Sequence, residues 1–188
     1  MREQAGQGRG LRLVGDVPTD VADEETPITW FTGRWRGLSN FAPSQIVVDG
    51  VVYKSVEQAF QVAKTLKVHE RKAIMAAHTP GEVKRLGRKV TLRPGWESGR
   101  VEVMRRCLRA KFSLPGFREL LLSTGERELV EGNHWHDNDW GRCSCRRCAS
   151  VPAKNLLGRL LMEIRTEIQE EGTARRHQVS GVSSAASS

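Results

Sequence analysis

Residues 45–64 read QIVVDGVVYKSVEQAFQVAK, and most of the fold prediction depends on them. Two runs rich in β-branched residues flank Asp49 and Gly50, a pair suited to the positive φ angles of a tight turn. These runs therefore predict a β-hairpin. Ser55 follows as a helix N-cap, and Gln58 three residues later can complete a capping box. We therefore expect a helix to start directly after the hairpin and to run over residues 56–68.

The pattern outside this stretch is also mainly helical. Apolar residues recur at helical spacing in several segments that lie between Gly- and Pro-containing turns. We expect further helices over 69–78, 81–90, 96–112, 117–125 and 155–168, and short strands at 28–31 and 127–132. The sum is an α+β protein, a mostly helical single domain with a small antiparallel β-sheet.

Composition sets the expected domain boundaries. Residues 1–27 show no hydrophobic period and are expected to form a flexible N-terminal segment, and residues 169–188 are expected to form a disordered tail rich in Ser and Ala. Residues 28–168 then form the folded domain. No apolar run approaches the ~20 residues of a membrane span, and the first ten residues lack a secretory apolar stretch. We therefore expect a soluble cytoplasmic protein with no membrane partner.

The positive charge is concentrated in the expected domain. The whole chain has a formal net charge of +8, whereas residues 28–165 carry 25 Lys/Arg and 13 Asp/Glu, a net charge of +12. A basic domain is typical of proteins that bind phosphates, pyrophosphates or nucleic acid. The same composition is also consistent with a solvated basic surface that has no specific partner.

The helix after the hairpin carries the first candidate site. Glu57, Phe60, Gln61 and Lys64 are spaced at i, i+3, i+4 and i+7, so they project from one helix face. A carboxylate and an amine beside an aromatic ring and an amide are suited to line a substrate pocket. Charged pairs of this kind are also common on ordinary exposed helices. The spacing alone leaves both interpretations open.

The loop at residues 133–141, NHWHDNDWG, carries the second candidate site. It brings carboxylates, imidazoles, amides and two indoles into nine positions, which a purely structural loop rarely needs. Indole rings stack on bases or ribose, and an Asp can orient a hydroxyl group or a water molecule. We therefore expect this loop to have a functional role.

Three closely spaced cysteines follow this loop. Cys143, Cys145 and Cys148 form C-x-C-x-x-C, with His134 and His136 just upstream. Three thiolates and an imidazole would suit tetrahedral zinc, but the pattern lacks the paired C-x-x-C spacing of a specific zinc motif. We predict no cofactor and no metal ligands, and keep structural zinc at the three cysteines as the alternative.

Several of these segments resemble the NADAR family in their order along the chain. They are WFTGRWRGLSNFAPS (30–44), the hairpin into SVEQAFQVAK (55–64), Trp96 at the start of a helix ending in LRAKF, LLSTGERELVEG (121–132), NHWHDNDWG and KNLLGRLLMEIR (154–165). The resemblance spans about residues 28–165. It implies an N-glycosidase that cleaves a ribose C1–N bond. The family's substrates are ADP-ribose attached to guanine in nucleic acid, or the small phosphoribosylamino-pyrimidine metabolites of riboflavin synthesis.

The resemblance also implies the site residues. Glu57, Lys64 and Asp137 are the predicted catalytic residues, and the predicted substrate-binding residues are Asn40, Trp96, Trp140 and Asn155. Asn40 and Trp96 taken singly would be interpreted as structural residues. In the expected mechanism Glu57 is the acid/base and Lys64 forms a Schiff base with the opened ribose. Departures from the family pattern leave substrate choice open; they are Gln58, Ala59, Phe60 and Ala153.

Two other classes of function remain open at this point. One is a non-catalytic module that binds ADP-ribose or NAD in the same pocket. The other is a zinc-stabilised nucleic-acid-binding protein, an interpretation supported by the basic domain and the cysteines. In such a protein the helix face at 57–64 would have no function. The sequence makes no prediction of the oligomeric state.

Overall fold

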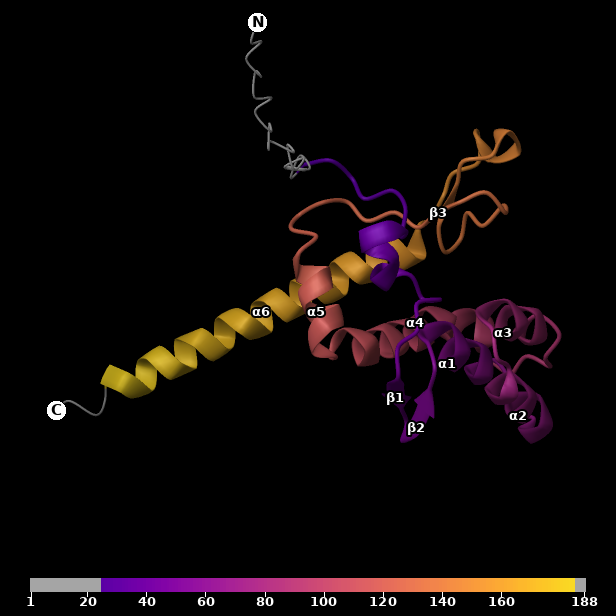
Figure 1. The fold of residues 1–188 in the computed structure, drawn as a ribbon, viewed down its shortest axis with the longest axis horizontal. Coiled ribbons are helices and arrows are strands. Elements are labelled where there is room, and N and C mark those ends of the chain that lie inside the picture. The colour runs from indigo at the N-terminus through magenta and orange to yellow at the C-terminus, as the bar shows by residue number, and fades with distance from the viewer. Residues whose placement is uncertain (1–24, 185–188) are drawn as a thin grey trace, which may run out of the picture.

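The computed structural model describes residues 25–184. The expected flexible segment 1–27 therefore lies, apart from its last three residues, outside the described part of the chain. The described residues form a single, mostly helical domain with a small two-stranded antiparallel sheet, which confirms the predicted fold class. Figure 1 shows most of the helices gathered on one side of the molecule, with a long C-terminal helix extending away from them.

The predicted hairpin is present. Strands β1 (Ile46–Val48) and β2 (Val51–Tyr53) pair antiparallel, with Ile46 opposite Tyr53. Asp49 and Gly50 between them have φ angles of 52° and 75°. Both central residues of the turn thus take the left-handed conformation that a type I′ turn requires, and that Asp-Gly adopts readily.

The helix after the hairpin ends earlier than predicted. Helix α1 spans Val56–Ala63 and α2 spans Val68–Ala76, with a break between them. Within the break Thr65 Oγ1 accepts a hydrogen bond of 3.1 Å from the Lys67 backbone N–H and donates to the Glu70 carboxylate. This side-chain turn competes with helix continuation, so the first helix ends at Ala63 instead of at residue 68, and the second begins at Val68.

Three helices follow in the middle of the chain, and a longer helix lies in its C-terminal part. They are α3 (Pro80–Gly87), α4 (Trp96–Phe112), α5 (Pro115–Leu122) and α6 (Leu156–Ser184). The expectation of a disordered tail from residue 169 is wrong as far as Ser184, because α6 continues through it. Residues 169–176 have no buried side chain, so their helical conformation comes from local backbone bonding, which the apolar pattern could not indicate.

The remaining elements are short. They are the 3₁₀-helices η1 (Gly33–Leu38) and η2 (Arg146–Cys148), and strands β3 (Gly132–Asn133) and β4 (Arg142–Cys143), which pair in parallel. The strands predicted at 28–31 and 127–132 are reduced to one bridge between Ile28 and Leu129 and to the start of β3. The β3–β4 pair closes the base of the 133–141 loop.

The core joins α1, α4, α5 and α6 to the hairpin. Its fully buried apolar side chains include Leu38, Ile46, Val56, Ile74, Leu108, Phe112, Leu121, Leu129, Leu157 and Leu161. Helix α1 packs against α2, α3 and α4, so it is enclosed on several sides. Within the described residues, no helix has the length and apolarity needed to cross a lipid bilayer.

Candidate active site

A cavity of about 150 Å³ opens beside α1. Its wall is formed by α1, α3, the segment before the hairpin and the 131–140 region, with one residue each from α4 and α6. The lining residues are Asn40, Phe41, Glu57, Phe60, Gln61, Lys64, Lys84, Arg88, Met104, Glu131, Asn133, Trp135, Asp137, Trp140 and Leu157. The structure thus brings together five of the seven predicted site residues. Trp96 and Asn155 lie elsewhere.

Glu57 is positioned by the start of α1. The Ser55 hydroxyl accepts a hydrogen bond of 3.1 Å from the Gln58 backbone N–H, which fixes the first turn of the helix as predicted. The Glu57 backbone N–H donates to the Asn40 carbonyl at 2.9 Å. The same Asn40 also donates its side-chain amide to Glu57 Oε2 at 2.5 Å, and Gln61 donates to Oε1 at 2.8 Å. Each carboxylate oxygen of Glu57 therefore has an amide donor.

The environment of Glu57 changes its affinity for a proton. The residue is only 3% exposed, and burial raises the pKa of its carboxyl above the ordinary 4.5. The hydrogen bond from Gln61 and the charges of Lys84 and Lys64 lower the pKa, against this larger influence. A carboxyl group under such opposed influences is suited to exchange a proton with a substrate.

Lys64 lies at the C-terminal end of α1, two turns from Glu57. Its Nζ donates to the Gly87 carbonyl at 3.4 Å and lies 5.7 Å from the centre of the Phe60 ring. Burial lowers the pKa of the Lys64 amine below the ordinary 10.5, and the Glu57 charge acts in the opposite direction. Partial burial therefore increases the fraction of uncharged, nucleophilic amine.

The close approach of α3 to α1 completes this wall. A Cβ atom at Gly87 would meet Gln61 Oε1 at 1.9 Å, so the close contact between the two helices depends on the absence of a side chain there. Lys84, on α3, and Arg88, which caps it, line the same cavity. The Lys84 ammonium lies 5.2 Å from the centre of the Phe41 ring and 5.3 Å from that of Trp135. The cavity entrance is thus both cationic and aromatic.

Asp137 has two functions in the 133–141 loop. Its Oδ1 accepts hydrogen bonds from the backbone N–H groups of Asp139 at 3.1 Å and Trp140 at 2.8 Å, which shapes the loop. Its side chain also lines the cavity opposite α1. Asn133 supports it from the other side, since Asn133 Oδ1 accepts from the Asp137 N–H at 3.2 Å and Nδ2 donates to the Asp137 carbonyl at 2.7 Å. The loop is therefore held by its own polar side chains.

Trp96 does not line the cavity. It is 4% exposed and packs behind Phe60, with ring centroids 5.1 Å apart, whereas Trp140 contacts Phe60 from the cavity side at 5.3 Å. The predicted stacking of Trp96 on substrate is therefore not supported by its position. As the first residue of α4, it is buried by helix packing and supports the Phe60 ring.

Asn155 is likewise placed in a supporting position. Its Oδ1 accepts from the Glu131 backbone N–H at 3.1 Å and its Nδ2 donates to the Leu129 carbonyl at 2.8 Å. It also has a φ angle of 47°, which Asn tolerates better than most residues. Its side chain is thus used to fix the 129–131 segment at the start of α6, and it does not reach the cavity.

Glu131 is a third carboxyl group in the cavity, beside those of Glu57 and Asp137, and sequence reasoning missed it. Burial raises its pKa to about 7, and the Asp137 charge adds to this effect, while Lys84 and Lys111 oppose it. Its Oε2 atom is buried without a hydrogen-bond partner. The only sequence signal was a carboxylate directly before the polar loop, in a segment that we interpreted as a strand.

Lys111 is buried in the interior and interacts electrostatically with Glu131. It is 0% exposed, its Nζ donates to the Ser39 carbonyl at 2.7 Å, and burial lowers its pKa to about 7, with Glu131 acting in the opposite direction. A buried amine bonded to the residue before Asn40 links the core to the segment that orients Glu57. The sequence predicted a helix over 96–112 but did not indicate that Lys111 is buried within it.

Glu131→Gln is expected to stabilise the protein at pH 8 and not at pH 5. Because the folded-state pKa is raised from 4.5 to about 7, the wild-type carboxyl opposes folding increasingly as the pH rises through this window. Glutamine removes that charge, so the expected gain above pH 7 is about 1–3 kcal/mol. Thermal unfolding at several pH values measures it. Glu128→Gln, on an exposed side chain of the same segment, is the control, and a pH-independent gain from Glu131→Gln would contradict the assignment.

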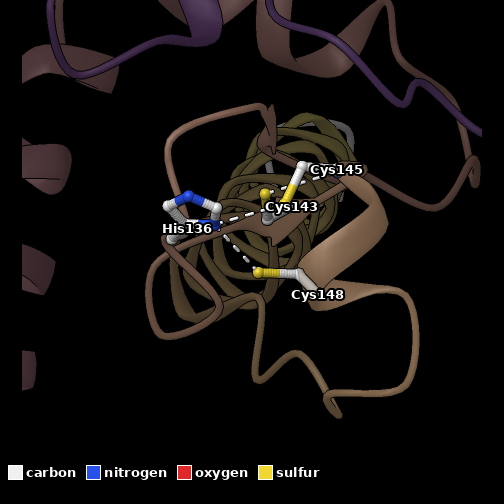
Figure 2. A group of neighbouring side chains, drawn as sticks. All are labelled: His136, Cys143, Cys145 and Cys148. Atoms are coloured by element: carbon white, nitrogen blue, oxygen red, sulfur yellow. Dashed lines mark hydrogen bonds between the residues drawn. The ribbon is translucent and has the colours of Figure 1, made fainter.

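One cluster of potential metal ligands lies beside the cavity. His136, Cys143, Cys145 and Cys148 have their ligand atoms within 4.8 Å of one another (Figure 2). The sequence had indicated the three cysteines as an alternative zinc site without deciding between the two upstream histidines. The structure selects His136, since the His134 ring instead contacts Trp30 and the Ser144 hydroxyl.

Comparison with known proteins agrees with this architecture. The NADAR domain family model matches residues 24–169. The chain is 38% identical over 141 residues to "N-glycosidase YbiA" of Escherichia coli (strain K12), which covers 71% of this chain and 82% of that protein. The NMR structure of the E. coli protein YbiA matches with a TM-score of 0.68 and 35% identity, over 79% of this chain and 89% of that one.

Longer relatives match over a smaller part of their length. "Riboflavin biosynthesis protein PYRR, chloroplastic" of Zea mays is 33% identical over 176 residues, which is 82% of this chain and 27% of that protein. "Riboflavin biosynthesis protein VVA0006" of Vibrio vulnificus is 35% identical over 141 residues, 71% of this chain and 35% of the relative.

Proposed function

The chain belongs to the NADAR family, and from this membership we propose that it is an N-glycosidase that hydrolyses a ribose C1–N bond. One observation carries the proposal. The buried Glu57 carboxyl, with an amide donor on each oxygen, and the partly desolvated Lys64 amine line one cavity. An acid/base and a nucleophile that share one cavity meet the chemical requirements of glycosidic bond cleavage.

The proposed reaction starts with leaving-group departure. Protonated Glu57 donates its proton to the leaving nitrogen as the C1–N bond breaks, which avoids the release of an anionic base. The Lys64 amine forms a bond to C1, and the proton that it loses returns to the Glu57 carboxylate. The ribose ring then opens to a Schiff base between Lys64 and C1. Water hydrolyses this Schiff base, releasing the sugar as its aldehyde and restoring the amine.

Other cavity residues have supporting roles in this scheme. Asp137, with Oδ1 already bonded to its own loop, is assigned to ribose hydroxyls through its other oxygen. Trp140 forms an aromatic wall on Phe60 and is assigned to stacking on the ribose or base. Glu131, with a pKa of about 7, is a second group able to exchange protons near neutral pH.

The size of the cavity supports a substrate that is only partly enclosed. At about 150 Å³ it is smaller than the ~300–1,000 Å³ that encloses a drug-sized ligand. It is suited to one sugar ring. A more open depression of about 490 Å³ adjoins it and shares Lys84, Arg88, Trp135 and Asp137 with its wall. Lys154 also lines this depression, so phosphates outside the cavity would meet several cations.

We propose ADP-ribose attached to guanine in nucleic acid as the substrate. Cations at the cavity entrance suit a pyrophosphate, and the net charge of +12 over residues 28–165 suits a nucleic-acid backbone. A second candidate is a phosphoribosylamino-pyrimidine intermediate of riboflavin synthesis. It is favoured by the relatives named riboflavin biosynthesis proteins, which are 33–35% identical to this chain.

Two parallel incubations distinguish these substrates. The purified chain is mixed separately with an oligonucleotide that carries ADP-ribose on guanine and with the phosphoribosylamino-pyrimidine, and released sugar is measured by mass spectrometry. Release of ADP-ribose supports the first substrate, and release of ribose phosphate from the pyrimidine alone supports the second. Binding of ADP-ribose with no release from either compound would contradict the enzyme proposal and favour a non-catalytic binding module.

Lys84→Gln is expected to raise KM about 10- to 100-fold with little change in kcat. A charged hydrogen bond to phosphate contributes about 1.5–3 kcal/mol, and Lys84 lies at the cavity entrance, where it would contact the phosphate rather than the breaking bond. Steady-state kinetics on the preferred substrate measure the effect. Lys89→Gln removes an exposed charge near the end of the same helix, outside both cavity walls, and should leave KM unchanged. An unchanged KM for Lys84→Gln would contradict the assignment of Lys84 to phosphate binding.

A further inference from the structure

The four residues of the cysteine cluster converge from three separate elements. Cys143 ends β4, Cys145 precedes η2 and Cys148 ends η2, while His136 projects from the 133–141 loop. Figure 2 shows their side chains pointing toward one another. Cys143 and Cys148 are buried, Cys145 is partly buried and His136 is exposed, so the cluster lies at the rim of the domain.

The distances within the cluster suit tetrahedral zinc. Zinc–sulfur bonds of ~2.3 Å and zinc–nitrogen bonds of ~2.0–2.1 Å place tetrahedral ligand atoms about 3.6–3.8 Å apart. In this chain all four ligand atoms lie within 4.8 Å of one another. His136 Nδ1 is 3.2 Å from Cys145 Sγ and 3.3 Å from Cys148 Sγ. Small side-chain rotations are enough to bring the atoms to metal-binding distances.

The backbone around the cluster adds a feature of metal–thiolate sites. The Cys145 N–H donates to Cys143 Sγ at 3.5 Å, and a hydrogen bond of this kind stabilises a thiolate ligand. A disulfide would use two of the three sulfurs and would leave a thiol and the imidazole without a function. Four convergent donors match a metal ion better than a disulfide.

We propose that His136, Cys143, Cys145 and Cys148 bind one structural Zn²⁺ ion. Three sulfurs and one nitrogen select a soft or borderline metal, and protein ligands fill all four tetrahedral positions. No open position then remains for water or substrate, so the ion has a structural role. The proposal is independent of the N-glycosidase reaction, because none of the four ligands lines the cavity of about 150 Å³.

The metal would fix the loop that forms one wall of the cavity. His136 lies between Trp135 and Asp137, both of which line the cavity. Its backbone has a φ angle of 65°, a left-handed conformation that is strained for a non-glycine residue. A bond from His136 to a metal held by the three cysteines offsets this strain. Zinc thereby ties the loop to β4 and η2.

The first test is metal content. The full chain is purified under reducing conditions with Zn²⁺ present, and bound zinc is measured by native mass spectrometry and elemental analysis. We expect one zinc ion per chain, and at least a tenfold lower occupancy in Cys145→Ser and His136→Ala. Cys107→Ser and His134→Ala are the matched controls, since Cys107 lies in α4 and His134 contacts Trp30, both outside the cluster. Both controls should keep full occupancy.

The second test uses the wild-type chain, so it does not depend on variants that fold. Replacement of zinc by Co²⁺ should give the intense visible absorption of a tetrahedral cobalt–thiolate site, and chelation of the zinc should lower the Tm. Thiol labelling should show the three cluster cysteines protected only while metal is bound. Absence of zinc from the reduced chain, or a disulfide seen as a mass lower by two hydrogens, would overturn the proposal. Equal zinc loss in His134→Ala and His136→Ala would overturn the ligand assignment.

Discussion

Glu57→Gln is expected to lower kcat by about 10²- to 10⁴-fold, the usual contribution of a positioned acid/base. Glutamine keeps the shape of the side chain but can neither donate a proton to the leaving nitrogen nor accept it back. Rates are measured on whichever substrate the release experiment identifies. Because binding groups at the cavity entrance are untouched, KM should change much less than kcat.

The fold of this variant should survive the substitution. The buried Gln61 Oε1 has no hydrogen-bond partner, while Gln61 Nε2 donates to Glu57. If the Gln61 amide rotates by half a turn, its oxygen can accept a hydrogen bond from a glutamine amide at position 57. The Tm should therefore stay near that of the wild type. Glu102→Gln, on an exposed carboxylate that pairs with Arg105, is the matched control, and an undiminished kcat for Glu57→Gln would exclude the acid/base role.

Lys64→Gln is expected to lower kcat by at least about 100-fold and to abolish covalent trapping. Borohydride added during turnover reduces a Schiff base to a stable amine, so the wild-type chain should gain the mass of a reduced sugar at Lys64. The amine is more nucleophilic than that of an exposed lysine because burial lowers its pKa below the ordinary 10.5. Peptide mass mapping after trapping identifies the modified residue.

Lys84→Gln is the matched control for trapping. Lys84 lines the same cavity, but in the proposed mechanism it contacts phosphate and not C1. At saturating substrate this variant should therefore form the adduct at Lys64 as the wild type does. Normal turnover by Lys64→Gln would rule out the Schiff base. It would leave Glu57-catalysed attack by water as the mechanism.

The two variants also separate the N-glycosidase proposal from the proposed covalent intermediate. If Glu57→Gln is inactive and Lys64→Gln is active, the N-glycosidase proposal stands without a covalent intermediate. If both retain activity, the cavity beside α1 is not the active site. The zinc proposal is unaffected by either result, because its readouts are metal content, cobalt absorption and thiol protection.

Local sequence determined the hairpin and the functional face of α1. Asp49 and Gly50 specify a turn through their tolerance of positive φ, and Ser55 starts the helix by accepting the Gln58 N–H. Once a helix starts there, its 3.6-residue period places Glu57 and Lys64 on one face. These features depend on residues within a few positions of each other, so they could be predicted without knowing how the chain packs.

Tertiary structure decided which residues surround the Glu57–Lys64 face of α1. Lys84, Glu131 and Lys111 come from segments at least twenty residues from Lys64, and their approach depends on close packing such as that allowed by Gly87. The changed pKa values of Glu131 and Lys111 follow from burial, which no local pattern reveals. The resemblance to the NADAR family assigned Trp96 and Asn155 to substrate, whereas the folded chain places them in support of Phe60 and the 129–131 segment.

The cysteine cluster shows both what the local sequence can predict and what it cannot. The spacing of Cys143, Cys145 and Cys148 was visible in the sequence, but it left the fourth ligand undecided between two histidines. The positive φ of His136 and the pairing of β3 with β4 turn His136 toward the sulfurs and leave His134 outside. Sequence determined which chemical groups are available, whereas the path of the folded backbone decided which of them meet, because side chains distant along the chain are brought together only by packing.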